Sequence, residues 1–103
     1  MSGKAISVEE FVEKKAKMRV IDIRATSAFS NDVSQLPGSE NVPLHNLEHH
    51  TKNWNRFETL LVVCADGQES VEGQEVLMKA GFVSVLRLDG GMDSWRQSDQ
   101  ASS

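Results

Sequence analysis

The stretch Leu60-Leu61-Val62-Val63-Cys64-Ala65-Asp66-Gly67-Gln68-Glu69-Ser70 changes from a run of apolar residues into a short polar loop. An apolar run without alternation predicts a strand that is buried on both faces, and therefore a central strand of a sheet. The pattern becomes helical over residues 71–80, and Gly81 supplies a stop after it. A central strand, a tight loop and a helix in this order predict the repeating unit of an α/β fold.

Cys64, the only cysteine of the chain, ends this apolar run. A thiol at the end of a strand, wrapped by a glycine-containing loop and facing the start of a helix, is placed for nucleophilic chemistry. Backbone N–H groups in such a loop and the helix dipole favour the thiolate over the thiol, and they can hold an anionic ligand beside it. A lone cysteine at a strand end is also often a small buried hydrophobic residue. The residues alone leave these two interpretations about equally supported.

The N-terminal half of the chain contains two further strand patterns. Ser7 and Glu10 form a capping box, which predicts a helix that runs to about Lys17. Residues 20–23 are a short β-branched run and predict a buried strand. Residues 41–44 predict a brief edge strand, because proline is tolerated at an edge.

The C-terminal half repeats the alternation of strand and helix. Residues 83–88 predict the last strand, and Asp89-Gly90-Gly91 predicts a tight turn before a short helix. The whole pattern predicts an α/β domain with a mainly parallel central sheet. In such sheets ligands bind at the carboxyl ends of the strands, where Asp22, Arg24 and Cys64 stand. An Asp/Arg pair at a strand tip is more often structural than reactive, so we expect this pair to brace the site.

Composition excludes several classes of protein. A chain of 103 residues makes one domain with a core that needs no disulfide or metal, and its 39% hydrophobic and 25% charged residues are those of an ordinary soluble protein. A net charge of −4, the absence of tyrosine and the absence of a basic cluster disfavour a nucleic-acid partner. We expect no signal peptide and no membrane segment. One cysteine cannot form an internal disulfide, so we expect a reducing, cytoplasmic location.

Residues 45–57 are the least regular part of the chain. His45 and His49 have the spacing of metal ligands on a helix. Apart from the adjacent His50, no third ligand stands nearby in the sequence, so we expect no metal site. We expect Trp54 and Phe57 to anchor this segment in the core.

Four segments occur in the order of a known protein family, and the match that they mark extends over about residues 5–96, nearly the whole chain. The segments are Val20-Ile21-Asp22-Ile23-Arg24, Leu36-Pro37-Gly38-Ser39-Glu40-Asn41-Val42-Pro43, Val62-Val63-Cys64 with its loop, and Leu88-Asp89-Gly90-Gly91-Met92-Asp93-Ser94-Trp95. With them the chain resembles the single-domain rhodaneses, a family of sulfurtransferases. The resemblance implies a flattened three-layer α/β/α sandwich around a mainly parallel sheet. It also implies a single rhodanese-like domain over residues 1–103, with a polar, frayed tail at residues 97–103.

The resemblance implies that Cys64 becomes a persulfide. Its thiolate attacks the outer sulfur of a donor, keeps that sulfur as Cys-S-SH and passes it to a nucleophilic acceptor in a ping-pong reaction. Thiosulfate and cyanide are the generic donor and acceptor, a protein persulfide or thiol is an equal possibility, and no cofactor is implied. The loop N–H groups would cradle the persulfide and its donor, and the Ser70 hydroxyl would add a hydrogen bond. This loop consists of Ala65, Asp66, Gly67, Gln68, Glu69 and Ser70.

The loop departs from the family pattern in its charge. Gly67 and Ser70 match the common Cys-x-x-Gly-x-x-Ser pattern, but many members also carry an arginine here that helps to hold an anionic donor. This loop contains Asp66 and Glu69 and no basic residue. Two carboxylates near a thiolate oppose its formation and repel thiosulfate. Gln35 also stands where many members have a histidine.

Two other functions compete with sulfur transfer. A catalytically weak rhodanese-fold module that binds a partner protein is favoured by the acidic loop and disfavoured by the presence of Cys64. A phosphatase or arsenate reductase with a cysteine-led anion loop needs an arginine at the end of that loop to hold a doubly charged oxyanion. Ser70 stands at this position, or Glu69 if the loop is counted one residue shorter, so the sequence disfavours the second alternative.

Overall fold

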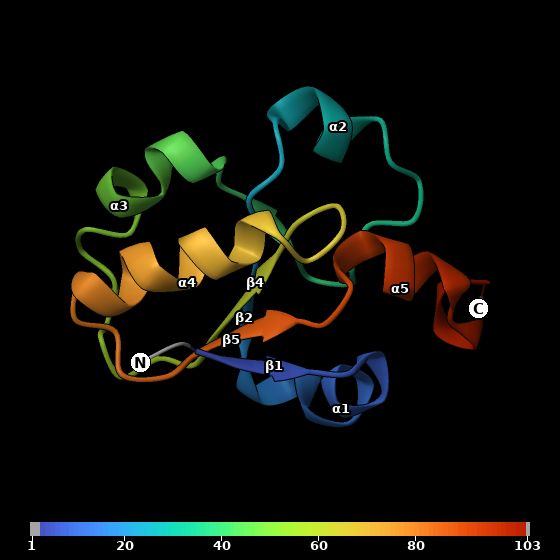
Figure 1. Ribbon diagram of the computed structural model, residues 1–103, viewed down its shortest axis with the longest axis horizontal. Coiled ribbons are helices and arrows are strands. Elements are labelled where there is room, and N and C mark those ends of the chain that lie inside the picture. Colours follow the sequence, from blue (N-terminus) through green and yellow to red (C-terminus); the bar gives the residue numbers. More distant parts are fainter. Residues whose placement is uncertain (1–2, 103) are drawn as a thin grey trace.

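Residues 3–102 are described by a computed structural model, and they form five strands: β1 (Lys4–Ile6), β2 (Arg19–Asp22), β3 (Glu40–Asn41), β4 (Leu60–Val63) and β5 (Val85–Leu88) (Figure 1). The strands make one sheet in the order β1-β5-β4-β2-β3, and every neighbouring pair is parallel. The predicted parallel sheet is confirmed, and β4 is its central strand.

The helices of the described residues are α1 (Val8–Lys14), α2 (Thr26–Ser30), α3 (Leu47–His50), α4 (Glu69–Lys79) and α5 (Gly91–Gln97), with 3-10 turns η1 (Lys15–Lys17), η2 (Leu44–Asn46) and η3 (Asp99–Ser102). The Glu10 N–H donates to the Ser7 hydroxyl oxygen at 3.1 Å, so the predicted cap of α1 is confirmed. The turn η3 lies in the predicted tail, whose last residue is outside the described range. None of the helices in residues 3–102 is long and apolar enough to cross a membrane.

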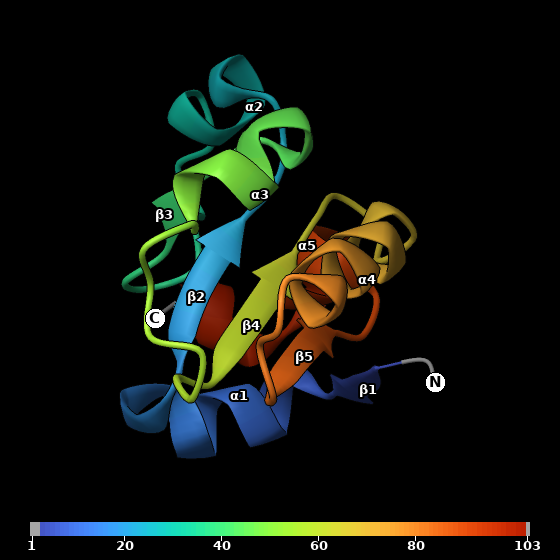
Figure 2. The same ribbon diagram turned by 90° about the vertical axis from the view of Figure 1, so that its left-hand side faces the viewer.

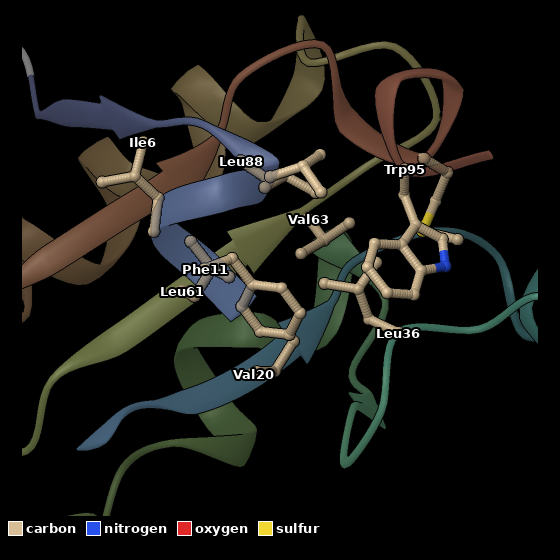
Figure 3. Packing of buried hydrophobic residues seen from close by; sticks show 10 residues of the cluster. Ile6, Phe11, Val20, Leu36, Leu61, Val63, Leu88 and Trp95 are labelled. Atoms are coloured by element: carbon tan, nitrogen blue, oxygen red, sulfur yellow. The ribbon is translucent and has the colours of Figure 1, made fainter. Parts of the chain in front are cut away.

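One face of β4 packs against α1 and α5. Leu61 and Val63 point to this face, where they meet Phe11 of α1 and Trp95 of α5 (Figure 3). The two aromatic rings meet edge to face, with their centroids 6.0 Å apart. Such pairs contribute about 0.5–1.5 kcal/mol beyond the apolar area they bury. This cluster fixes α5 beside the end of β4.

The other face of β4 packs against α3 and α4. Leu60, Val62 and Cys64 point to this face and share a buried cluster with Leu47 of α3 and Leu77 of α4. Every residue of β4 is 0% exposed, as a central strand covered on both faces must be. Helices therefore lie on both faces of the sheet (Figure 2), and the predicted three-layer arrangement is confirmed.

The edge strand β1 was not expected from the sequence. It has three residues, of which only Ile6 is buried, so it shows no apolar run. Distant groups hold it: the Asp89 N–H donates to the Ile6 carbonyl oxygen at 2.9 Å, and the Gln74 side chain donates to the Lys4 carbonyl oxygen at 3.0 Å. Because Gln74 is 70 residues away from Lys4, no local pattern could reveal this contact.

The segment of residues 41–57 differs from two predictions. The predicted edge strand lies at an edge of the sheet, but β3 ends at Asn41 and the chain turns into η2 after Pro43. Trp54 packs against the buried cluster on the α3 and α4 face, as expected. Phe57 does not reach the core: it is 79% exposed, in a turn where its N–H donates to the Asn55 side chain at 2.9 Å.

Candidate active site

Cys64 follows β4 directly, at the edge of the sheet where all the parallel strands end (Figure 2). The expected start of the next helix at residue 71 is wrong, because Glu69 and Ser70 already form the first turn of α4. Glu69 and Glu72 favour this earlier start, since acidic side chains in a first turn complement the helix dipole. The connecting loop is therefore only Ala65-Asp66-Gly67-Gln68.

Two backbone N–H groups converge on the sulfur of Cys64. The Gly67 N–H donates to Sγ at 3.1 Å, and the Ser70 N–H donates to Sγ at 3.2 Å. Cys64 is 1% exposed and Ser70 is buried, whereas Gly67 is half-buried. These two N–H donors point the positive ends of their dipoles at the sulfur, close to the start of α4.

Side chains of the loop secure its backbone rather than contact the sulfur. The Ser70 hydroxyl, for which we expected an added hydrogen bond in the cradle, donates to the Gly67 carbonyl oxygen at 2.9 Å. On the outer side, Asp66 Oδ1 accepts a hydrogen bond from the Gln68 N–H at 3.0 Å. The buried Ser70 thus ties the loop to α4. The other side chains of the predicted site loop, those of Ala65, Asp66, Gln68 and Glu69, belong to exposed residues.

The N-terminus of α5 closes over the same loop. The Met92 N–H donates to the Cys64 carbonyl oxygen at 2.9 Å, and the Asp93 N–H donates to the Ala65 carbonyl oxygen at 3.0 Å. Gly91 has a φ of +59°, and a Cβ at this position would collide with the Cys64 carbonyl oxygen. Sequence reasoning assigned this glycine only to a tight turn. Two consecutive glycines at a strand end were the available signal for close approach of backbone.

Asp22 and Arg24 form a buried ion pair at the end of β2, beside β4. Arg24 Nη2 lies 2.8 Å from Asp22 Oδ2, and Arg24 Nε lies 3.1 Å from both carboxylate oxygens. Arg24 Nη1 donates to Asp32 at 2.9 Å. The Arg24 side chain is 7% exposed and bound to two carboxylates, so it is not presented to an anionic ligand.

Asp32 extends this ion pair to α5, a link that sequence reasoning missed. Its Oδ2 accepts a hydrogen bond from Arg96 Nη2 at 2.7 Å, across 64 residues of sequence. Burial opposes ionisation of Asp32, but hydrogen bonds from Ser34, Arg96 and Arg24 outweigh burial and hold the pKa of its carboxyl well below the usual range. The Trp95 indole N–H adds a hydrogen bond to the Ser34 carbonyl oxygen at 2.7 Å. Residues 32–34 therefore fasten α5, which in turn contacts the Cys64 loop.

The histidines at residues 45 and 49 lie on different elements, His45 in η2 and His49 in α3. Within the described part of the chain, no three histidine, cysteine, aspartate or glutamate side chains gather in a way that could hold a metal ion. His45 instead lines a groove at the carboxyl edge of the sheet.

A sequence profile of the Rhodanese-like domain family matches residues 7–98. The thiosulfate sulfurtransferase GlpE of Pseudomonas putida is 32% identical over 95 residues, which cover 90% of this chain and 84% of that protein. The protein of the same name from Pseudoalteromonas translucida is 29% identical over 97 residues, which cover 92% and 90%. Human single-domain sulfurtransferase TSTD1 matches the structure with a TM-score of 0.86 at 16% identity, over 94% of this chain and 98% of that chain. A rhodanese-related protein from Thermoplasma volcanium matches with a TM-score of 0.81 at 24% identity, over 91% of each chain.

Proposed function

The chain belongs to the rhodanese-like domain family, and on this premise we propose that it transfers sulfane sulfur through a persulfide on Cys64. The predicted class of enzyme, a rhodanese-type sulfurtransferase, is confirmed by relatives named thiosulfate sulfurtransferase. One observation carries the persulfide proposal: the buried sulfur of Cys64 accepts hydrogen bonds from the N–H groups of Gly67 and Ser70.

In the loading step, the Cys64 thiolate attacks the outer sulfur of the donor. With thiosulfate as the donor, the bond from Sγ to the outer sulfur forms while the S–S bond of thiosulfate breaks, and sulfite leaves with the bonding electron pair. The product is the persulfide anion of Cys64. The N–H groups of Gly67 and Ser70 hold the thiolate before the attack, and they place donors beside the persulfide afterwards.

In the unloading step, a nucleophilic acceptor such as cyanide attacks the outer sulfur of the persulfide. The S–S bond breaks and Cys64 leaves as a thiolate. The two N–H donors stabilise this leaving thiolate, and a better-stabilised thiolate leaves faster. The same groups thus serve both halves of a ping-pong reaction.

Asp22 and Arg24 act in this proposal as braces and make no contact with substrate. Their ion pair ties the end of β2 to Asp32, and Arg96 on α5 binds the same carboxylate. The first turn of α5 donates hydrogen bonds to the carbonyl oxygens of Cys64 and Ala65. The network therefore positions the sulfur indirectly, because it holds α5 in place.

The test is the intact mass of the chain after incubation with thiosulfate. We expect the mass to rise by one sulfur atom and to return when cyanide is added. Cys64→Ser removes the only thiol in a nearly isosteric change, so this variant should fold, take up no sulfur and produce no thiocyanate. Turnover by the Cys64→Ser variant above the uncatalysed rate would remove Cys64 from the mechanism.

A non-catalytic module that binds a partner protein is the second candidate. The exposed carboxylates of Asp66 and Glu69 favour it, because their negative charge repels an anionic sulfur donor and attracts a basic surface of a partner protein. A chain that gains no sulfur from any donor, yet keeps its fold, would favour this candidate over the sulfurtransferase.

A further inference from the structure

A groove opens at the carboxyl ends of the strands, between α4 on one side and the chain from the end of β2 to η2 on the other. Its volume is about 490 Å³. A concave apolar surface of this size accommodates side chains rather than a small anion alone. Its apolar walls are formed by Ile23, Pro43, Leu44 and Val76.

Two residues of the groove lining are neighbours of groups that surround Cys64. Ile23 in one wall belongs to the same buried cluster as Cys64, and its N–H donates to the Val63 carbonyl oxygen at 2.9 Å. Glu69 in the other wall precedes Ser70, whose N–H donates to the sulfur at 3.2 Å. A ligand seated in the groove is therefore held close to the loop that surrounds the sulfur.

The charged side chains of this groove are carboxylates. Glu69 and Glu72 line it and are exposed, and neither takes part in an ion pair within residues 3–102. His45 is the third ionisable residue of the lining, which includes no lysine or arginine of the described chain. Arg24, at the end of β2, is already bound to two carboxylates.

We infer that the partner of Cys64 in sulfur transfer is a protein whose reacting cysteine is flanked by lysine or arginine and by an apolar side chain, docked in this groove. The inference rests on the proposed persulfide function. The carboxylates of the groove attract basic side chains, and the apolar walls accommodate an apolar side chain. The same carboxylates repel thiosulfate, which carries two negative charges. The apolar side chain of the partner fills the groove, while its basic side chains meet Glu69 and Glu72 at the rim.

With this partner as donor, the partner cysteine carries the persulfide. The Cys64 thiolate attacks the outer sulfur, the bond from Sγ to that sulfur forms, and the S–S bond of the partner breaks. The partner cysteine leaves as a thiolate, and the persulfide proton stays on the transferred sulfur. Atoms and electrons balance without a further oxidant or reductant. The basic residues of the partner stabilise its departing thiolate.

The test uses two synthetic peptides of equal length, each with one cysteine persulfide. The cysteine is flanked by lysine and leucine in the first peptide, and by glutamate and leucine in the second. The rate of sulfur transfer to the full chain is followed by intact mass at low ionic strength. We expect the lysine peptide to react about tenfold faster, and high salt to remove the difference because it screens exposed charges. Equal rates at low ionic strength would overturn the inference.

Variants then locate the preference. Combining Glu69→Gln with Glu72→Gln should slow the lysine peptide several-fold and speed loading by thiosulfate. Glu75→Gln is the matched control, because Glu75 is an exposed residue of the same helix that does not line the groove. It should leave both rates unchanged. An effect of Glu75→Gln as large as that of the double variant would assign the preference to net charge and contradict the inference.

Loading by thiosulfate separates this inference from the function on which it rests. If thiosulfate loads Cys64 but the two peptides react equally, sulfur transfer stands and the docking inference is wrong. If neither thiosulfate nor either peptide adds sulfur to the chain, the proposed function is wrong and the inference falls with it.

Discussion

Two neighbouring strand ends at the same edge of the sheet are stabilised by different groups. After β4, the backbone holds the chain around Cys64. The N–H groups of Gly67 and Ser70 bind the sulfur, while those of Met92 and Asp93 bind carbonyl oxygens of the loop. The hydrogen bonds of the Ser70 and Asp66 side chains go to the loop backbone and not to the sulfur, and the acidic side chains are exposed.

After β2, charged side chains rather than backbone groups hold the chain in place. Arg24 binds Asp22 and Asp32, and Arg96 binds Asp32 as well. The difference explains how a sulfur site can exist beside an acidic loop. The sulfur faces backbone N–H dipoles, whereas the nearby Arg24 is held in a structural ion pair.

The largest effect is expected when Arg24 is removed from the ion pairs that follow β2. Arg24→Gln leaves Asp22, which is 1% exposed, without its partner. Removing one member of a buried pair costs about 3–5 kcal/mol of unfolding free energy, which urea unfolding would measure.

Arg19 provides the control for this variant. It pairs with Glu40 and Glu58, and its side chain is 33% exposed. Arg19→Gln should therefore cost less, about 1 kcal/mol, because solvent screens partly exposed ion pairs. Equal losses in the two variants would show that the network after β2 is no more structural than a surface ion pair.

The next effect concerns the backbone end. Gly91→Ala forces a Cβ against the Cys64 carbonyl oxygen at a φ of +59°. We expect a loss of about 2–3 kcal/mol in unfolding free energy. We also expect sulfur loading at least about tenfold slower, since the loop must move. Stopped-time intact mass gives the loading rate.

Gly38 is the matched control, because it also has a positive φ, +76°, but a Cβ there meets nothing within 4 Å. Gly38→Ala should cost about 1 kcal/mol of stability and leave loading unchanged. If Gly91→Ala loads sulfur as fast as Gly38→Ala, the contact between α5 and the loop does not position the sulfur.

A smaller effect, with a pH signature, is expected at Asp32. Because its pKa is held below the usual range in the folded chain, the unfolded chain binds more protons, so this carboxylate stabilises the fold above about pH 4 and less as the pH falls. Asp32→Asn should cost about 1–2 kcal/mol at pH 7. Urea unfolding of both proteins from pH 7 to pH 3 should show the difference shrinking below about pH 4. A difference that stays constant would contradict the ion pairs drawn around this residue.

The smallest effect is expected in the acidic loop. Asp66→Asn keeps the oxygen that accepts the Gln68 N–H and removes only an exposed charge. Stability should change by less than about 0.5 kcal/mol, and thiosulfate loading should rise about twofold at low ionic strength and not at high salt. A rise of about tenfold in the loading rate would mean that the Asp66 carboxylate faces the sulfur. Backbone dipoles would then not be the main electrostatic environment of the sulfur.

The parts of the fold that depend on local pattern could be predicted. The apolar run of β4 and the β-branched run of β2 identify the centre of the sheet, and the Ser7 cap marks the start of α1. The edge strand β1 escaped prediction because one buried residue, Ile6, makes no pattern. The prediction that Phe57 anchors its segment in the core was wrong, because it relied on the rule that large aromatic residues are usually buried. Phe57 is exposed because it lies in a turn.

The same limit applies to the site. Cys64 and its glycine-containing loop could be recognised because they are contiguous with a buried strand. The link from Asp32 to Arg96 spans 64 residues, and the approach of Gly91 to Cys64 joins two separate loops, so both depend on the folded chain. The direction of the Ser70 hydroxyl depends on the backbone of the helix start, which was placed two residues too late.

The central claim is that N–H groups of the backbone hold the sulfur that Cys64 transfers. The most direct measurement is an amide-resolved NMR spectrum of the chain before and after thiosulfate. We predict that the largest changes in chemical shift occur at the N–H groups of Gly67 and Ser70, that cyanide reverses them, and that Cys64→Ser shows none. A chain that gains sulfur on Cys64 while both of these amide signals stay in place would contradict the claim.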